Sequence, residues 1–326
     1  MKSPSWPVSW CVLAVAAGAL MGCAKPGTDA PGAASPAAAP SAAQPSFATP
    51  EEASEALVAA VEKDDRAALQ QLLGPGTEQL LASGDPVQDR QERNAFLAEY
   101  RAQHTLSAGG ANDLVLLVGA DQWPLPMPLV RKDGRWRFDG AAGADELVLR
   151  RIGANELNTI DVMYGFVAAQ RDYAATGHDR QKPGVYARQL RSSPGKQDGL
   201  YWEVAAGEAP SPAGPLLASA AAEGYANPGA QGGHAPYHGY LYRMLTSQGA
   251  AASGGAQDFL VDGRLTGGFA LLAYPATYGA SGIMTFIVNQ DGVVWQRDLG
   301  TDTALAAAAI QEFNPDDSWT PLAPEE

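Results

Sequence analysis

The chain has 326 residues, a formal net charge of −14 at pH 7 and a pI of about 4.7. An acidic chain repels phosphate backbones and anionic headgroups, so the charge disfavours nucleic-acid binding. Hydrophobic residues make up 46% of the sequence, and a chain of this length can bury a sizeable core, in two domains as we expect.

The N-terminus has the pattern of an export signal. Lys2 precedes an apolar stretch, Val8 to Leu20, that is short for a membrane-spanning helix. We therefore predict a signal peptide over residues 1–22. The end of this stretch, Leu20-Met21-Gly22-Cys23, resembles the bacterial lipobox, which implies that Cys23 is acylated and becomes the mature N-terminus. An ordinary secretory signal with a chance cysteine is the alternative.

Residues 23–46 are almost wholly Ala, Pro, Gly and Ser, which predicts an extended tether rather than a folded segment. Position 24 is Ala and not Asp, so the sorting rule for lipoproteins favours the inner leaflet of the outer membrane, facing the periplasm. Cys11 would leave with the signal and Cys23 would carry lipid. The folded part is then expected to contain neither a disulfide nor a thiolate site.

Residues 47–143 are predicted to form an N-terminal α+β domain. Thr49-Pro50 begins a first helix, Asp65 precedes a second that Gly74 ends, and a third includes Phe96 to Tyr100. Strands follow at Leu114–Val118 and Arg135–Phe138, the latter after an Asp133-Gly134 turn. Helices followed by such a hairpin resemble the small cone-shaped folds of the nuclear-transport-factor-2-like (NTF2-like) class.

Between those strands, residues 123–130 carry prolines at positions 124, 126 and 128. Because alternate residues of a strand point their N–H groups to the same side, one edge of this segment has no donors. The spacing therefore predicts a protected sheet edge or a polyproline segment, and not a central strand.

Residues 144–326 are predicted to form a second α+β domain. A long helix is expected over 145–176, with Leu157, Ile160, Tyr164, Val167, Arg171 and Ala174 as one packing stripe. A short helical turn or strand at 186–190 and a helix at 215–223 come next. Strands are expected at 239–245, 268–273, 283–288 and 293–297, the last two joined by a hairpin turn at 289–292.

Several stretches together resemble the bacterial domain-of-unknown-function family numbered 2950. They include "SGDPVQDR", "RRIGANEL", "AQRDYA", "SPGKQDGLYW", "PYHGYLYR" and the run from Gly267 to Gly300. The resemblance covers nearly the whole chain after the tether. It implies an exported, often lipid-anchored protein, and the family brings no established activity.

A remoter resemblance concerns the second half alone. "NELNTIDVMYGFVAAQRDYAA", "GYLYRM", "FALLAYP" and "GIMTFIVNQDGVVW" follow the order of motifs in type IV pilin and pseudopilin heads. This implies a long helix packed on an antiparallel sheet. Pilins carry an apolar half-helix directly before this point, whereas residues 145–151 are charged, so a pilin-like head used as a module fits better than a filament subunit.

Ser281 in "YGASGI" is the first candidate for chemistry. A nucleophile elbow needs Gly-x-Ser-x-Gly between a strand and a helix. Here the fifth residue is Ile283, a strand follows, and nothing selects a partner among His104, His178, His234 and His238. A turn serine is the expected role, with a serine hydrolase as the remote alternative.

The other candidates are weaker still. His234 and His238 are four residues apart but lie in a loop with Pro236 between them, so their spacing predicts no zinc site. Asp179 and Asp291 each offer one turn carboxylate, which is little for calcium. A carboxylate pair among Asp258, Asp262 and Asp298 would need a suitable separation in space. No metal, cofactor or catalytic residue is therefore predicted.

The expected function is that of a non-enzymatic, lipid-anchored interaction or assembly module with an envelope protein as partner. One alternative is a small-ligand binder with a cavity in the N-terminal domain, lined by Trp123, Trp136 and Phe138. The other is the hydrolase that uses Ser281.

Overall fold

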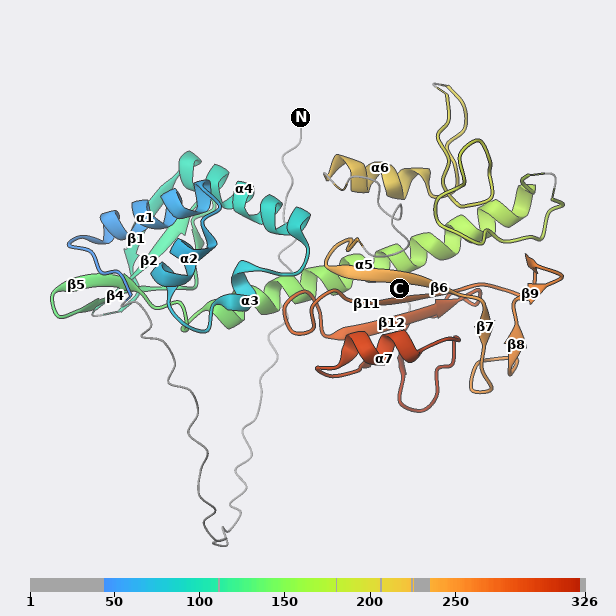
Figure 1. The fold of residues 1–326 in the computed structure, drawn as a ribbon. Helices are drawn as coiled ribbons and strands as arrows, with labels where there is room; N and C mark the ends of the chain where they lie inside the picture. Colours follow the sequence, from blue (N-terminus) through green and yellow to red (C-terminus); the bar gives the residue numbers. More distant parts are fainter. Residues whose placement is uncertain are drawn as a thin grey trace, which may run out of the picture. The chain divides into compact units, whose positions relative to one another are not determined.

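The computed structural model describes most of the chain after the predicted tether (Figure 1). The described residues are 44–110, 112–179, 181–205, 207–223, 225 and 235–322. They belong to one compact unit, so the domain boundary at 143/144 stays a prediction. The predicted signal peptide, Cys23, most of the tether and His234 lie outside the described residues.

The first part of the fold consists of four helices and a five-stranded antiparallel sheet in the order β1-β2-β4-β5, with β3 paired to β2. The helices are α1 (Pro50–Glu62), α2 (Arg66–Leu73), α3 (Glu78–Leu81) and α4 (Pro86–Ala102). The strands are β1 (His104–Ala108), β2 (Asp113–Val118), β3 (Trp123–Pro124), β4 (Leu129–Lys132) and β5 (Arg135–Phe138).

Side chains cap the starts of three helices. The Thr49 hydroxyl accepts from the Glu52 amide, as predicted, and Asp65 and Asp85 cap α2 and α4 through their carboxylates. The helices pack on the sheet through a core that includes Leu57, Leu72, Leu116, Leu129 and Phe138.

The proline-rich segment divides at its last proline. Trp123 and Pro124 form the short strand β3, which pairs with β2 alone. Leu129 and Val130 belong to β4, which lies between β2 and β5 and pairs with both. The prediction of an edge or polyproline segment was therefore wrong for the last two residues. From position 129 the backbone again carries amide donors, so it can pair on both sides.

The second part is built on α5 (Ala144–Thr176) and a five-stranded antiparallel sheet in the order β14-β13-β12-β11-β6. The strands are β6 (Tyr240–Leu245), β11 (Ala270–Pro275), β12 (Met284–Asn289), β13 (Trp295–Asp298) and β14 (Thr320–Pro321). Smaller elements are α6 (Gly214–Ala222), α7 (Thr303–Ala309) and β7 (Ser247–Gln248), β8 (Gln257–Asp258), β9 (Leu260–Val261) and β10 (Arg264–Leu265). The class is α+β, as predicted.

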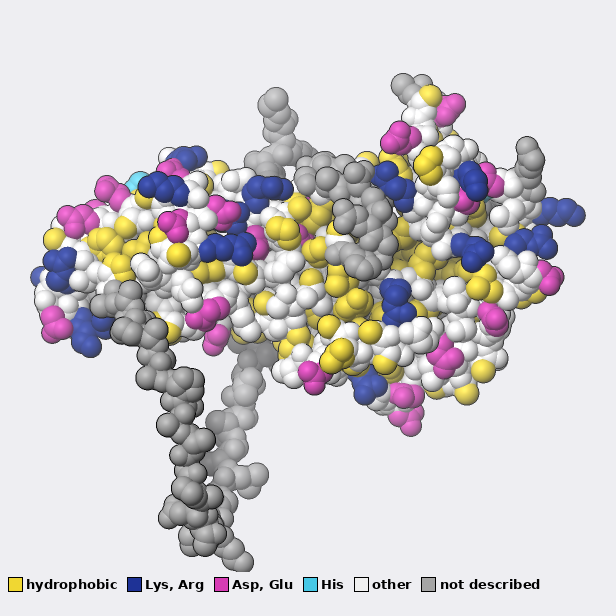
Figure 2. All heavy atoms as spheres, viewed as in Figure 1, with side chains coloured by type: hydrophobic (Ala, Val, Ile, Leu, Met, Phe, Trp, Pro, Cys, Tyr) yellow, Lys and Arg dark blue, Asp and Glu magenta, His cyan; other side chains and the backbone are white. Residues whose placement is uncertain are grey.

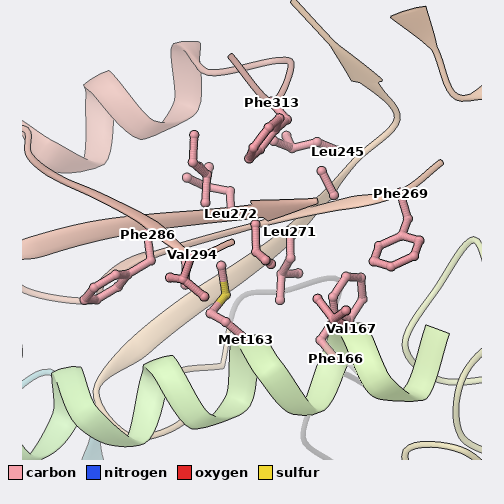
Figure 3. Close-up of a cluster of buried hydrophobic side chains, with 14 of the residues drawn as sticks. Met163, Phe166, Val167, Leu245, Phe269, Leu271, Leu272, Phe286, Val294 and Phe313 are labelled. Carbon is pink, nitrogen blue, oxygen red and sulfur yellow. The ribbon is translucent and has the colours of Figure 1, made fainter. Parts of the chain in front are cut away.

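Helix α5 and α7 cover opposite faces of this sheet (Figure 3). Met163, Phe166 and Val167 of α5 pack on the face that presents Leu271, and neighbouring Leu272 points to the α7 side. The predicted hairpin is confirmed, because β12 and β13 pair antiparallel and the Gly292 amide donates to the Asn289 carbonyl.

The predicted packing stripe of α5 was wrong at two positions. Leu157 is 63% exposed and Tyr164 is 37% exposed, while Asn155, Thr159 and Gln170 are buried. This helix is covered from two directions, by polar contacts near its start and by the apolar sheet farther on. A stripe chosen by apolar character therefore missed the face that is buried through hydrogen bonds.

Candidate functional site

A buried polar junction joins α4, α5 and the strands of the second sheet. Asp85, at the start of α4, has no exposed surface. One of its oxygens accepts from the amides of Val87 and Gln88, at 3.0 and 3.1 Å. The other accepts from the Tyr225 hydroxyl at 2.8 Å and the Gly239 amide at 3.1 Å. One carboxylate thus connects three distant stretches of chain.

The start of α5 supplies the next contacts of the junction. Asn155 exchanges two hydrogen bonds with Gln88 and donates to the Ser281 carbonyl at 2.8 Å. Glu156 accepts from the amides of Ile283 and Met284, both at 3.0 Å. The junction therefore also holds the chain where it enters β12.

Arg151 forms the other end of the junction. Its side chain is 5% exposed and pairs with Glu92 of α4 at 2.8 Å. The guanidinium also donates to the carbonyls of Gln79 and Leu80, at 3.0 and 2.8 Å. These bonds attach α5 to α4 through Glu92 and to α3 through the carbonyls of Gln79 and Leu80.

Two glycines allow the close packing of the junction. A Cβ at Gly239, where φ is +73°, would lie 2.4 Å from the Asn155 amide nitrogen. A Cβ at Gly282 would lie 2.2 Å from the Tyr240 hydroxyl, which donates to the Met284 carbonyl. Any larger residue would displace these partners.

His238 lies beside the Asp85 carboxylate. Its ring contacts Tyr237 and Tyr225, and its Nε2 is 3.5 Å from Glu223. Burial lowers the pKa of His238 below its ordinary value, and the carboxylates of Glu223, Asp85 and Asp161 offset part of that effect. Burial also raises the pKa of Tyr225 far above its usual range, so its hydroxyl stays protonated and donates to Asp85.

The His238 environment predicts a loss of stability in acid. Because the folded-state pKa is below the unfolded value of about 6.5, the unfolded chain binds more protons as pH falls through that value. The free energy of unfolding is thus expected to fall from about pH 6.5 downward. Urea unfolding at several pH values measures this effect. In His238→Gln, the part of the decrease in the free energy of unfolding that comes from His238 is expected to be absent. Equal pH slopes in the two proteins would contradict it.

Ser281 is placed as a turn residue. It is fully buried, and its hydroxyl donates to the Thr277 carbonyl and accepts from the Thr277 amide, at 3.1 and 3.0 Å. The polar partners of the described histidine rings are other residues: Tyr100 for His104, Thr176 and Gln197 for His178, and Glu223 for His238. None of these three histidine rings is therefore placed to act as a general base for the Ser281 hydroxyl.

Ser281→Ala is expected to cost about 1–2 kcal/mol in the free energy of unfolding, because it removes two hydrogen bonds of a buried turn. A fluorophosphonate probe is expected not to label the unaltered chain, since the hydroxyl is buried and bonded to the backbone. Labelling that disappears in Ser281→Ala would contradict this account and support a hydrolase.

The five carboxylates considered in the sequence are all exposed. Asp179 accepts from the Gln197 amide, Asp258 from the Leu260 amide, Asp298 from the Gly300 amide and Asp291 from the Asn289 side chain. Within the described ranges, no three His, Cys, Asp or Glu side chains gather as metal ligands would.

The three aromatic residues of the expected ligand cavity have different surroundings. Trp123 is 36% exposed on β3, beneath the guanidinium of Arg150 at 4.8 Å. Trp136 of β5 lies beneath Arg131 and pairs with Phe47, whereas Phe138 is buried in the core. A separate groove of about 360 Å³ runs between α1 and α2, lined mainly by Pro45, Phe47, Ala56, Ala60, Ala68 and Leu72.

The outer face of α5 exposes apolar side chains. Leu149 is 59% exposed and Leu157 is 63% exposed; with Tyr164 at 37% they recur at helical spacing. Gly153 and Ala168 are exposed on the same face, and a Cβ at Gly153 would meet no atom within 4 Å. We call these five residues the α5 stripe. Figure 2 shows apolar side chains gathered near the middle of the visible face.

The model of one protein family matches residues 44–322, and its description is protein of unknown function, DUF2950. The chain belongs to the DUF2950 family. The matched range includes both sheets and the junction of Asp85, Arg151 and Asn155. No curated protein and no solved structure gives a significant match to this DUF2950 chain.

Proposed function

We propose that this DUF2950 chain is a non-catalytic interaction or assembly module, anchored to the outer membrane by a lipid on Cys23 and facing the periplasm. The observation that carries the proposal is the α5 stripe. Three large apolar side chains on one helix face are exposed, although the same helix buries polar residues such as Asn155 and Gln170. Apolar area left in water along one face is typical of a surface that binds another protein.

The junction supports a non-catalytic role. Its polar groups are engaged with each other and with the backbone: Asp85 accepts four hydrogen bonds, Glu156 accepts two, and Ser281 is buried. Groups used in this way hold elements together and are poorly placed to meet a substrate.

The anchor rests on the lipobox-like sequence at Cys23 and on the Ala/Pro-rich tether after it. Stable anchoring needs more than one acyl chain, which lipidation of this kind supplies. In the part of the chain that the structure describes, no helix has the length and apolar character to cross a bilayer.

The experiment is chemical crosslinking in intact cell envelopes, followed by capture of the chain. We expect adducts with the unaltered chain and a loss of most of them in Leu157→Asp, because a charge in the α5 stripe opposes burial. Leu305→Asp is the matched control, since Leu305 is 75% exposed on α7, away from the stripe. Equal adducts in both variants, or none in the unaltered chain, would overturn the proposal.

A second candidate is small-ligand binding, which the groove between α1 and α2 favours because apolar side chains form most of its lining. Ala59→Trp would fill this groove. An apolar fluorescent probe is expected to bind the unaltered chain and to lose binding in the variant. Equal binding by the two proteins would exclude the groove as its site.

A further inference from the structure

The α5 stripe has a symmetry along the helix that points to its partner. Measured from the midpoint between Leu157 and half-buried Ile160, Gly153 and Tyr164 are equally far away along the axis, at about 8 Å each. Leu149 and Ala168 form the next such pair. In each pair, the large residue on one side of the midpoint is as far from it as the small residue on the other side.

The charges at the ends of the stripe follow the same symmetry. Glu146 and Arg171 are equidistant from the midpoint, and both are exposed. Glu146 contacts Arg150 on its own helix, and Arg171 is held at the surface by a 2.9 Å hydrogen bond to the Gln290 carbonyl. The five stripe residues between them are uncharged, so acid and base mark its two ends.

A helix with these features is complementary to a second copy turned end for end. In an antiparallel pair related by a two-fold axis, Tyr164 of each copy meets the open space over Gly153 of the other, and Leu149 meets Ala168. Glu146 of each copy then faces Arg171 of the other. Small residues let the two backbones approach closely, which lets the large side chains pack against the facing helix.

We propose that the α5 stripe binds the α5 stripe of a second copy of this chain, with the two helices antiparallel. This inference rests on the proposed function and names the partner of the same surface. Complementarity of both shape and charge favours a second copy over a different protein, whose surface would have no reason to match this order of residues.

The first test uses the full chain with Leu157→Cys and a bismaleimide crosslinker in intact cell envelopes. Because position 157 lies close to the two-fold axis, the cysteines of the two copies should be near each other, and the crosslinker should join them into a covalent dimer. Leu305→Cys and the unaltered chain, whose cysteines are Cys11 and Cys23, are the controls and are expected to give background only. A dimer of Leu157→Cys well above both controls is the expected result.

The second test exchanges the charges in the Leu157→Cys background. Glu146→Arg or Arg171→Glu alone places like charges opposite each other, and each is expected to lower dimer yield on the order of tenfold. The two changes together restore opposite charges and are expected to restore most of the yield. Because both residues are exposed, the single variants should keep their fold, which circular dichroism checks. Failure of the double variant to recover would overturn the antiparallel pairing.

The outcomes separate this inference from the proposed function. If Leu157→Cys is crosslinked only to a different protein, the second copy is excluded and the interaction module stands. If it gives no adduct at all while remaining folded, both fail. A dimer that forms equally from Leu305→Cys would mean random collision and would also overturn the inference.

Discussion

Replacing Asp85 by alanine is expected to lower the free energy of unfolding by about 3–5 kcal/mol. The carboxylate is fully buried and accepts hydrogen bonds from two amides of α4, the Tyr225 hydroxyl and the Gly239 amide. Alanine would leave these four donors without an acceptor in a site that water does not reach. The variant would also lose the N-cap of α4.

Urea unfolding measures this effect, with Asp65→Ala as the matched control. Asp65 has the same role at the start of α2, where it accepts from the Ala68 amide, but it is exposed. Its loss is expected to cost about 1 kcal/mol, the usual worth of an N-cap. Similar losses in the two variants would mean that the junction adds nothing beyond the capping of a helix.

Replacing Arg151 by methionine is expected to cost about 2–4 kcal/mol. The guanidinium is buried, and two carbonyls and the Glu92 carboxylate would lose their donor. Because Glu92 is 35% exposed, water screens part of the ion pair, and most of the effect comes from the two carbonyls.

Its neighbour on the helix provides the control. Arg150 is 45% exposed and pairs with Glu146 one turn earlier, so Arg150→Met is expected to change the free energy of unfolding by less than about 1 kcal/mol. Thermal or urea unfolding of the two variants measures the difference. An effect of Arg150→Met as large as that of Arg151→Met would contradict the assigned roles.

The helices and the second sheet were largely predictable because their signals are local. Thr49, Asp65 and Asp85 precede helices that they cap, and Asp291-Gly292 lies in the turn between β12 and β13. The helices α3 and α7 were not predicted. α3 has only four residues, α7 is alanine-rich, and neither has a side-chain cap, so their sequences carry little signal. The two-residue strands β7–β10 and β14 are too short for a periodic pattern.

The junction could not be predicted, because its bonds join residues far apart in sequence. Tyr225 is 140 positions from Asp85, and Ser281 is 126 positions from Asn155. The family motifs include Asp85, Asn155 and Ser281, but they do not show that these residues lie together in space. Leu157 and Tyr164 of the α5 stripe were assigned to the packing face because leucine and tyrosine were expected to be buried. The buried face instead holds Arg151, Asn155 and Gln170 through hydrogen bonds.

We propose that protein covers the outer face of α5 in the cell. Hydroxyl-radical footprinting of the full chain, in intact cells and after dilution of the purified chain, tests it directly. Leu157 and Tyr164 are predicted to be protected in cells and labelled after dilution, while Leu305 is labelled equally in both. Equal labelling of Leu157 and Tyr164 in the two samples would contradict the claim.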